Sequence, residues 1–385
     1  MTTTLEVIFW LACALIVWTQ LGYAAALALI ARLRGEAATP AGPTPAAGLP
    51  DLSLIVAAHD EQEVIAAKVA NALALDYPRE RLELIVACDG CSDQTAERAR
   101  AAGADLVLEL PRGGKIRAQD AAVERSRGEI LAFSDANAQW EPDAARVLVA
   151  AFGDDRVGYA CGQVSFLQAA SGADAGNQEG VYWRYEMAVR TLESRLSSVT
   201  AGNGAIYATR RSAYIVVDPI MGHDLSLPFN VVKRGRRAVY VPAARASEKM
   251  VPSLAGEFAR KRRMMSHTWP IVLRGGMLSP RGYPPGYAAM IVSHRLLRYA
   301  TPGLHLLALL ANIGLLLAGT GPLYAVTLGL QLALLAAATL AGTVRARPML
   351  IARYYVLTTA SPAAGLWDWL RHGTEASWEA AEGTR

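Results

Sequence analysis

The sequence predicts an α/β domain with a mostly parallel β-sheet, joined to a membrane by apolar helices near both ends of the chain. Short hydrophobic runs alternate with helical segments in the first half, and three of these runs end in carboxylates. Apolar stretches of about 20 residues lie near both ends and are flanked by arginines. The 385 residues are 52% hydrophobic, with a mean hydropathy of +0.20, which is high for a water-soluble enzyme.

The first apolar segment, 7–30, is long enough to cross a bilayer. Arg32 and Arg34 follow it and favour the cytoplasmic side at that end. A signal peptide is the alternative, but the apolar run exceeds a typical h-region and no clear cleavage site follows. We therefore predict a transmembrane helix within 1–34 and a Pro-, Ala- and Gly-rich linker over 35–50.

The segment from 51 to about 164 alternates strand and helix, which predicts a parallel sheet with helices on both faces. Strands are expected at 52–58, at 82–88 and from Glu129, and helices at 63–75, 93–102 and 114–126. The strands end in carboxylate and amide side chains: Asp60 with Glu61, Asp89, and Asp135 with Asn137. The carboxyl ends of parallel strands are where open α/β sheets bind ligands.

Asp135 and Asn137 are separated by a single residue at a strand end, which puts two oxygen ligands on the same side. The Arg-Gly-Gly-Lys segment 112–115 places flexible backbone and a cation before a helix, where an anion can also meet the helix N-terminus. Cys88 and Cys91 have the spacing of half a zinc site, but no second Cys or His pair completes it. We interpret the cysteines as reduced core residues.

Four motifs, in order, resemble those of the family 2 glycosyltransferases, membrane enzymes with a GT-A nucleotide-sugar-binding fold. That family has an Asn-Glu-Glu-like turn, an Asp-Gly-Ser-x-Asp element, a Gly-Gly-Lys loop and an Asp-x-Asp metal motif. The corresponding segments here are 59–61, 89–93, 113–115 and 135–137. The resemblance covers roughly residues 52–269 and implies a UDP-sugar donor and a divalent cation, Mg²⁺ or Mn²⁺.

The resemblance also implies a role for each matching residue. Asp89 would hydrogen-bond the uracil, Glu61 would lie near the nucleotide, and Lys115 would face the base or the diphosphate. Asp135 and Asn137 would hold the cation that neutralises the leaving UDP. Asn137 departs from the family pattern, because an amide oxygen is a weaker ligand than a carboxylate.

The resemblance continues into the second half of the chain. Gly202, Asn203 and Gly204 match a glycine-rich acceptor-side loop, for which a strand with a bulge is the alternative. Asp224 matches the second carboxylate of an acidic pair and would be the general base of an inverting transfer, whereas His223 replaces the first acid. A helix N-cap is the alternative role for Asp224.

A dense basic run follows the expected general base. Arg260 and Arg263 lie three residues apart on one helical face, within joint reach of a diphosphate, or they contact anionic lipid headgroups. Trp269 is a candidate acceptor-side residue. Processive members such as cellulose and hyaluronan synthases carry Gln-x-x-Arg-Trp here, and because the Gln is missing and the Arg and Trp are separated, the motif does not support processive synthesis.

Two further apolar stretches, 299–318 and 323–340, are parted by a Gly-Thr-Gly-Pro turn and predict a transmembrane hairpin over 299–343. Arg345 and Arg347 follow it, so both arginine pairs place the middle of the chain in the cytoplasm.

The remaining boundaries follow from these elements: a GT-A domain over 51–270, an interfacial segment over 271–298, and a C-terminal membrane-associated segment and tail over 344–385. The apolar stretch 354–367 is short enough to be interfacial, re-entrant or a short span.

The resemblance, together with the placement of the arginines, implies an inverting glycosyltransferase of a bacterial inner membrane, with a cytosolic active site. It would move a sugar from a UDP-sugar to a lipid-linked or cell-surface glycan acceptor. The net charge of +4 is small and no nucleic-acid module accompanies it, so no nucleic-acid partner is expected. A processive exopolysaccharide synthase and a non-catalytic nucleotide-sugar sensor or scaffold are the alternatives.

Overall fold

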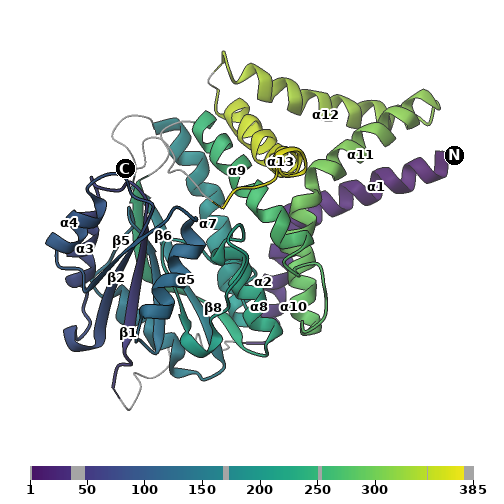
Figure 1. Cartoon of the computed structure of the whole chain (residues 1–385). Coiled ribbons are helices and arrows are strands. Elements are labelled where there is room, and N and C mark those ends of the chain that lie inside the picture. Colours follow the sequence, from purple (N-terminus) through teal and green to yellow (C-terminus); the bar gives the residue numbers. More distant parts are fainter. Residues whose placement is uncertain (1, 36–47, 168–172, 250–253, 345, 377–385) are drawn as a thin grey trace.

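The computed structural model describes residues 2–35, 48–167, 173–249, 254–344 and 346–376 (Figure 1). Within them, an α/β domain lies beside long helices formed by the two ends of the chain. Most of the predicted linker and Arg345 lie outside the described residues.

The described residues form one eight-stranded sheet of order β3-β2-β1-β4-β7-β6-β8-β5. Its strands are β1 Leu52–Ala58, β2 Leu82–Asp89, β3 Leu106–Leu110, β4 Ile130–Asp135, β5 Gln139–Trp140, β6 Val157–Leu167, β7 Tyr207–Arg210 and β8 Arg237–Lys249. The pairs of β1 with β2 and β4, of β2 with β3, and of β6 with β8 are parallel. The pairs β4/β7, β6/β7 and β5/β8 are antiparallel. The predicted α/β class with a mostly parallel sheet is therefore confirmed.

Helices cover both faces of this sheet: α3 Ile65–Leu73, α4 Thr95–Ala101, α5 Lys115–Arg125, α6 Ala144–Ala150, α7 Ala173–Leu196 and α8 His223–Lys233. The next helix, α9 Leu254–Leu273, contacts α8. The strand β1 shows why there are two cores, since successive side chains point to opposite faces. Leu54 and Val56 are buried in one core with residues of α3, α4 and α6. Ile55 is buried in the other core with residues of α5, α7 and α8.

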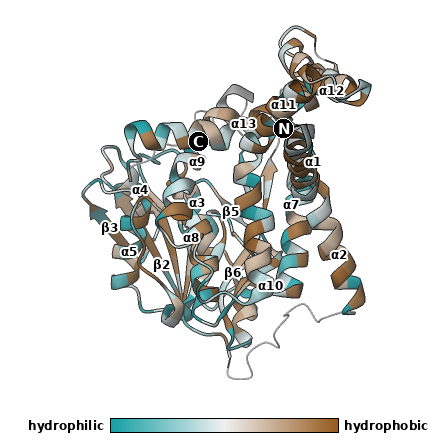
Figure 2. Ribbon diagram, turned by 90° about the vertical axis from the view of Figure 1, so that its right-hand side faces the viewer, coloured by the Kyte–Doolittle hydropathy of each residue, from teal (hydrophilic) through white to brown (hydrophobic). Residues whose placement is uncertain are grey.

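Three helical stretches in the described part of the chain are long and apolar enough to cross a membrane: Thr2–Leu33, Pro285–Leu317 and Pro322–Leu340. The first joins α1 Thr2–Val17, the π-helical η1 Trp18–Gly22 and α2 Tyr23–Leu33. The second joins α10 Pro285–Met290, the π-helical η5 Ile291–Leu296 and α11 Leu297–Leu317, and the third is α12 Pro322–Leu340. Figure 2 shows the hydrophobic colouring of these helices outside the α/β domain. The predicted single N-terminal helix and C-terminal pair are confirmed.

The second apolar helix begins earlier than the sequence predicts, at Pro285 rather than at residue 299. Arg295 and Arg298 interrupt the apolar run in the sequence and mark a boundary there. In the structure Arg295 is buried and Arg298 forms an ion pair with Glu186 of α7, so both lie within a continuous helix. Most of the segment predicted as interfacial therefore belongs to this helix or to α9.

The last helix, α13 Arg347–His372, packs against α9 (Figure 1). The guanidinium of Arg262 donates two hydrogen bonds of 2.6 Å to the carboxylate of Asp368. The indole of Trp269 donates to the carbonyl oxygen of Pro362 over 2.8 Å. The apolar C-terminal stretch is thus half of a longer helix that is docked on α9.

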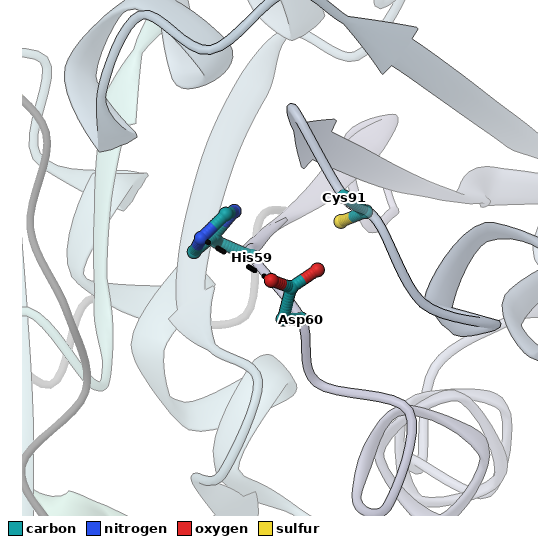
Figure 3. Close-up of side chains that lie close together, drawn as sticks. All are labelled: His59, Asp60 and Cys91. Atoms are coloured by element: carbon teal, nitrogen blue, oxygen red, sulfur yellow. Dashed lines mark ion pairs between the residues drawn. The ribbon is translucent and has the colours of Figure 1, made fainter.

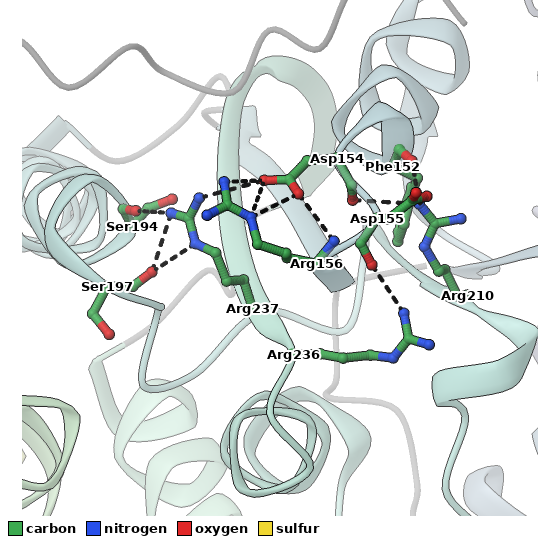
Figure 4. A network of polar contacts seen from close by, with 9 residues as sticks. All are labelled: Phe152, Asp154, Asp155, Arg156, Ser194, Ser197, Arg210, Arg236 and Arg237. Carbon is green, nitrogen blue, oxygen red and sulfur yellow. Dashed lines mark hydrogen bonds and ion pairs between the residues drawn. The ribbon is translucent and has the colours of Figure 1, made fainter. Parts of the chain in front are cut away.

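A polar network lies at the amino ends of β6 and β8, opposite the carboxyl ends of the parallel strands (Figure 4). Asp154 accepts hydrogen bonds from Arg156 and lies 3.8 Å from Arg237. Arg237 also donates to the carbonyl oxygens of Ser194 and Ser197 at the end of α7. These contacts join the amino ends of β6 and β8 to α7. The cavity lies at the opposite end of these strands.

Candidate active site

A cavity of about 1200 Å³ extends from the carboxyl ends of the parallel strands to the apolar helices. It is lined by residues from the ends of β1, β2 and β4, from α7, α8 and α9, and from η1, α11 and α13. Sequence-predicted site residues that line it are Glu61, Asp89, Lys115, Asp135, Asn137, Gly202, Asn203, Gly204, Asp224, Arg260 and Arg263. Residues as far apart in the sequence as Glu61 and Arg263 are thereby brought to one cavity.

Asp89, the last residue of β2, holds the glycine loop before α5. Its carboxylate accepts hydrogen bonds from the backbone N–H of Gly113 at 2.6 Å and of Gly114 at 2.9 Å, and lies 3.3 Å from Arg112. Gly114 has φ +94°, a conformation that side chains with a Cβ rarely adopt. The loop therefore needs both this glycine and the Asp89 carboxylate to present Lys115 at the start of α5.

His59, Asp60 and Cys91 form a small cluster where β1 and β2 end, with ligand atoms within 4.8 Å of one another (Figure 3). The imidazole Nδ1 of His59 is hydrogen-bonded to the carbonyl oxygen of Asp89 at 2.8 Å. Asp60 accepts a 2.7 Å hydrogen bond from the N–H of Ser92, and the Cys91 thiol faces the carbonyl oxygen of Ala58 at 3.5 Å. These contacts tie the two strand ends together and fix the turn that carries Glu61.

Asp135 ends β4 and forms an ion pair with Lys115. A Cβ added to Gly204 would lie 3.2 Å from the Lys115 Nζ and 3.4 Å from the Asp135 Oδ2. The Gly202–Gly204 loop therefore lies against the residues that the sequence predicts to bind the cation and the diphosphate. The absence of a side chain at Gly204 lets the backbone come this close to them.

Two titratable side chains that belong to none of the sequence motifs, Glu248 and Lys68, lie near Asp135. Burial and the Asp135 carboxylate raise the pKa of Glu248 in β8, which lines the same cavity, to about 7. Burial lowers the pKa of Lys68 in α3 to about 7, and its ammonium donates 2.7 Å to the carbonyl oxygen of Ala138 behind the turn. A divalent cation would relieve the repulsion between the two carboxylates, so Asp135 and Asn137 fit a hard cation such as Mg²⁺ or Mn²⁺.

Asp224 is the second residue of α8, and the cap position is occupied by Gly222, without a side-chain cap. The carboxylate of Asp224 forms no hydrogen bond or ion pair with another described residue. Its backbone is fixed, because the N–H of Gly202 donates to the Asp224 carbonyl oxygen over 2.7 Å. The structure thus excludes the N-cap alternative and places the carboxylate at the cavity.

His223 also faces the cavity but is 2% exposed. Its Nδ1 is hydrogen-bonded to the Tyr207 hydroxyl at 3.1 Å, while its Nε2 has no partner among the described residues. Burial and the nearby Lys115 charge lower the pKa of His223 to about 3. A neutral imidazole therefore stands where the family pattern has an acid.

Trp269 is the one predicted site residue that does not line the cavity with the others within the described ranges. Besides its hydrogen bond to Pro362, its ring lies 6.2 Å from the ring of Tyr299. Its position is between α9, α11 and α13, where it packs the helices together.

Comparison with known proteins agrees with this geometry. Residues 50–266, more than half of the chain, match the family model described as "Glycosyltransferase like family 2". An N-acetylglucosaminyltransferase of Rhizobium leguminosarum bv. viciae is 27% identical over 259 residues, 62% of this chain and 60% of that protein. A beta-monoglucosyldiacylglycerol synthase of Trichormus variabilis is 35% identical over 117 residues, 29% of this chain and 25% of that protein. The chain thus spans less than two thirds of the length of these relatives.

Among solved structures, the mannosyltransferase PcManGT from Pyrobaculum calidifontis, in complex with GDP-Man and Mn2+, superposes with a TM-score of 0.69 at 22% sequence identity. The match covers 96% of this chain and 98% of that one, so the two share a fold that includes the helices outside the α/β domain. The family model and this likeness of fold confirm the resemblance that the four motifs indicated: the chain belongs to the glycosyltransferase-like family 2.

Proposed function

We propose that this protein is a membrane glycosyltransferase that moves a sugar from a nucleotide sugar to an acceptor held at the bilayer, with inversion at the anomeric carbon and with Asp224 as general base. The observation that carries the proposal is the Asp224 carboxylate. It lies at the cavity that also contains Asp135 and Lys115, and it has no structural partner in the described residues. A protein that only binds a nucleotide sugar has no need for such a group.

The donor diphosphate would lie between the end of β4 and the Gly202–Gly204 loop. A cation held by Asp135 and Asn137 would neutralise the charge that develops on the leaving nucleoside diphosphate. Lys115 supplies a positive charge on the same side, and Arg260 and Arg263 line the cavity from α9.

Asp224 would take the proton of the acceptor hydroxyl while the hydroxyl oxygen attacks the anomeric carbon. The bond between that carbon and the diphosphate oxygen breaks in the same step, so the electron pair leaves with the diphosphate. A single displacement inverts the configuration and needs no protein nucleophile.

The cavity itself supports a membrane-bound acceptor. Its lining includes Leu21 of the first apolar helix, Thr301 of the second, and Ile351 and Tyr354 of α13. A lipid-linked substrate can enter from that side while the nucleotide sugar enters from the strand side. Arginines that follow the apolar segments favour a cytosolic α/β domain at an inner membrane.

The names of the related proteins support both substrate classes, a nucleotide sugar and a lipid. One relative is named for a glucosyldiacylglycerol, and the structural neighbour was solved with GDP-Man and Mn2+. We propose a UDP-sugar on the strength of the motifs, and Mg²⁺ or Mn²⁺ as the cation.

The test is a transfer assay with purified protein in detergent and Mg²⁺ or Mn²⁺, across UDP-sugars and GDP-sugars carrying labelled sugar. Membrane lipid extract is one acceptor and water-soluble oligosaccharides are the other. We expect labelled sugar to appear in the organic phase only when the donor is a UDP-sugar. Label that enters only water-soluble glycans would contradict the membrane acceptor, and label from GDP-sugars alone would contradict the UDP donor.

A further inference from the structure

The cavity contains a second charged region that the proposed chemistry does not use. Glu186, Arg190 and Glu193 lie on one face of α7, at spacings of four and three residues. Arg295 of η5 and Arg298 of α11 face them, and both line the cavity together with Glu186 and Arg190. This region, hereafter the arginine cluster (Arg190, Arg295 and Arg298), lies where the α/β domain meets the second apolar helix.

The two glutamates already have partners. Glu186 forms an ion pair with Arg298 and lies 3.4 Å from the Nε2 of His294. Glu193 accepts from the Tyr23 hydroxyl at 2.7 Å and lies 2.7 Å from the Nδ1 of His294. Although burial raises the pKa of Glu186, the charges of Arg298 and His294 hold it well below its usual range, so this carboxylate is ionised.

The positive charge is in excess. Among the described residues of this region, three arginines face two glutamates, so the arginines outnumber the carboxylates by one. Arg190 is 7% exposed, and its Nε and Nη1 have no hydrogen-bond partner among the described residues. The Nη2 of Arg295, which is also 7% exposed, has none either.

An unpaired guanidinium in such a place is costly for a folded protein, because it has lost water without gaining an anion. The donors that remain on Arg190 and Arg295 suit a phosphate, whose oxygens accept from guanidinium forks. The diphosphate of the donor belongs at Asp135 and Lys115, at the strand ends. An anion bound by the arginine cluster would instead lie in the part of the cavity next to the apolar helices.

We propose, on the basis of the function proposed above, that the acceptor is an anionic lipid whose headgroup phosphate is held by Arg190, Arg295 and Arg298, beside the hydroxyl that is glycosylated. The arginine cluster then orients the headgroup toward Asp224 while the lipid chains remain among α11, α13 and the first apolar helix. Recognition of the acceptor by charge also separates its site from the donor site.

The test measures binding in the absence of any donor, so it remains informative if turnover fails. The melting temperature of purified protein in neutral detergent is followed against dioctanoyl phosphatidic acid, dioctanoylglycerol, inorganic phosphate and UDP. The variant is Arg190→Gln, which leaves the pairs of Glu186 and Glu193 intact. Arg184→Gln is the matched control, an exposed arginine on the same helix that does not line the cavity.

We expect phosphatidic acid to raise the melting temperature of the wild type and of the control, and dioctanoylglycerol to have no effect. Arg190→Gln should need at least about tenfold more phosphatidic acid for half-maximal protection, with UDP protection unchanged. Without ligand it should melt no lower than the wild type, since an unpaired buried charge is removed. If Arg190→Gln fails to fold, Arg190→Lys should bind phosphatidic acid more weakly than the wild type, because the fork is lost.

Three results would overturn the proposal. Equal protection by phosphatidic acid in wild type and variant would remove Arg190 from the site. Protection by inorganic phosphate as strong as that by phosphatidic acid would show a site for free phosphate rather than for a lipid. Weakened UDP protection in Arg190→Gln would assign the arginine cluster to the donor.

Discussion

The contact between Gly202 and Tyr159 gives a prediction that can be worked out from the structure. A Cβ at residue 202 would overlap the Tyr159 hydroxyl oxygen and would lie 2.9 Å from its Cζ. Tyr159 is fully buried and stacks on Tyr207 at a ring distance of 5.7 Å, so it has no free space into which to turn. The loop must move instead, and with it the hydrogen bond from the Gly202 N–H to Asp224.

We expect Gly202→Ala to destabilise the protein by about 1–3 kcal/mol, the usual cost of overpacking a dense core. Tyr159→Phe alone should be nearly neutral, because the hydroxyl has no hydrogen-bond partner among the described residues. In the double variant the overlapping oxygen is gone and the remaining overlap is smaller. The double variant should therefore recover about half of the loss, with a coupling energy on the order of 1 kcal/mol.

The assay is thermal unfolding of the four proteins in one detergent, followed by transfer rates. Gly202→Ala should also lower kcat more than it raises the donor KM, because Asp224 is displaced whereas Asp135 and Lys115 are not. Strictly additive melting shifts in the double variant would refute the reasoning, as would a Gly202→Ala protein with wild-type stability and kcat.

Three further predictions concern the same cavity. Gly204→Ala should fold normally but raise the donor KM about tenfold, since its methyl group would occupy the space beside Lys115 and Asp135; an unchanged KM would place the diphosphate elsewhere. Asn137→Asp should bind Mn²⁺ on the order of tenfold more tightly in a paramagnetic resonance titration, because a second carboxylate joins Asp135; weaker binding would contradict this ligand pair. The folded pKa of His223 is lowered from 6.5 to about 3, so it contributes stability that is present above pH 6.5 and lost as pH falls toward 3. His223→Gln should therefore lose less stability over that interval, by at most about 5 kcal/mol, and parallel melting curves against pH would disprove the buried neutral imidazole.

Much of the α/β domain is predictable from local pattern. The helices expected at 63–75, 93–102 and 114–126 are present as α3, α4 and α5, each shorter by one or two residues at either end. The strand β3 is not predicted, because this short strand is only partly buried and shows no clear alternation. The continuous helix from Pro285 is also missed, since charged residues such as Arg298 break the apolar run, and Glu186, the partner of Arg298, lies 112 positions away.

The candidate site divides in the same way. Residues within short motifs, such as Asp135 and Asp224, are found from the sequence because neighbouring residues identify the loop that carries them. Glu248 and Arg190 are isolated in a strand and a helix, and only the fold brings them to the cavity. Trp269 illustrates the converse: a residue chosen for its place in a motif packs between helices, because α13 docks on α9 and takes its indole N–H.

The most direct test of the account compares Asp224→Asn with the wild type in two measurements on the same preparation. One is the affinity for UDP with Mn²⁺, and the other is the rate of sugar transfer to membrane lipid extract. We predict unchanged UDP affinity and a transfer rate lower by about 10²–10⁴-fold, the contribution of a positioned general base. Transfer at the wild-type rate would contradict the assignment of Asp224. A wild type that binds UDP yet transfers no sugar from any donor would contradict the proposed enzyme and favour a nucleotide-sugar sensor.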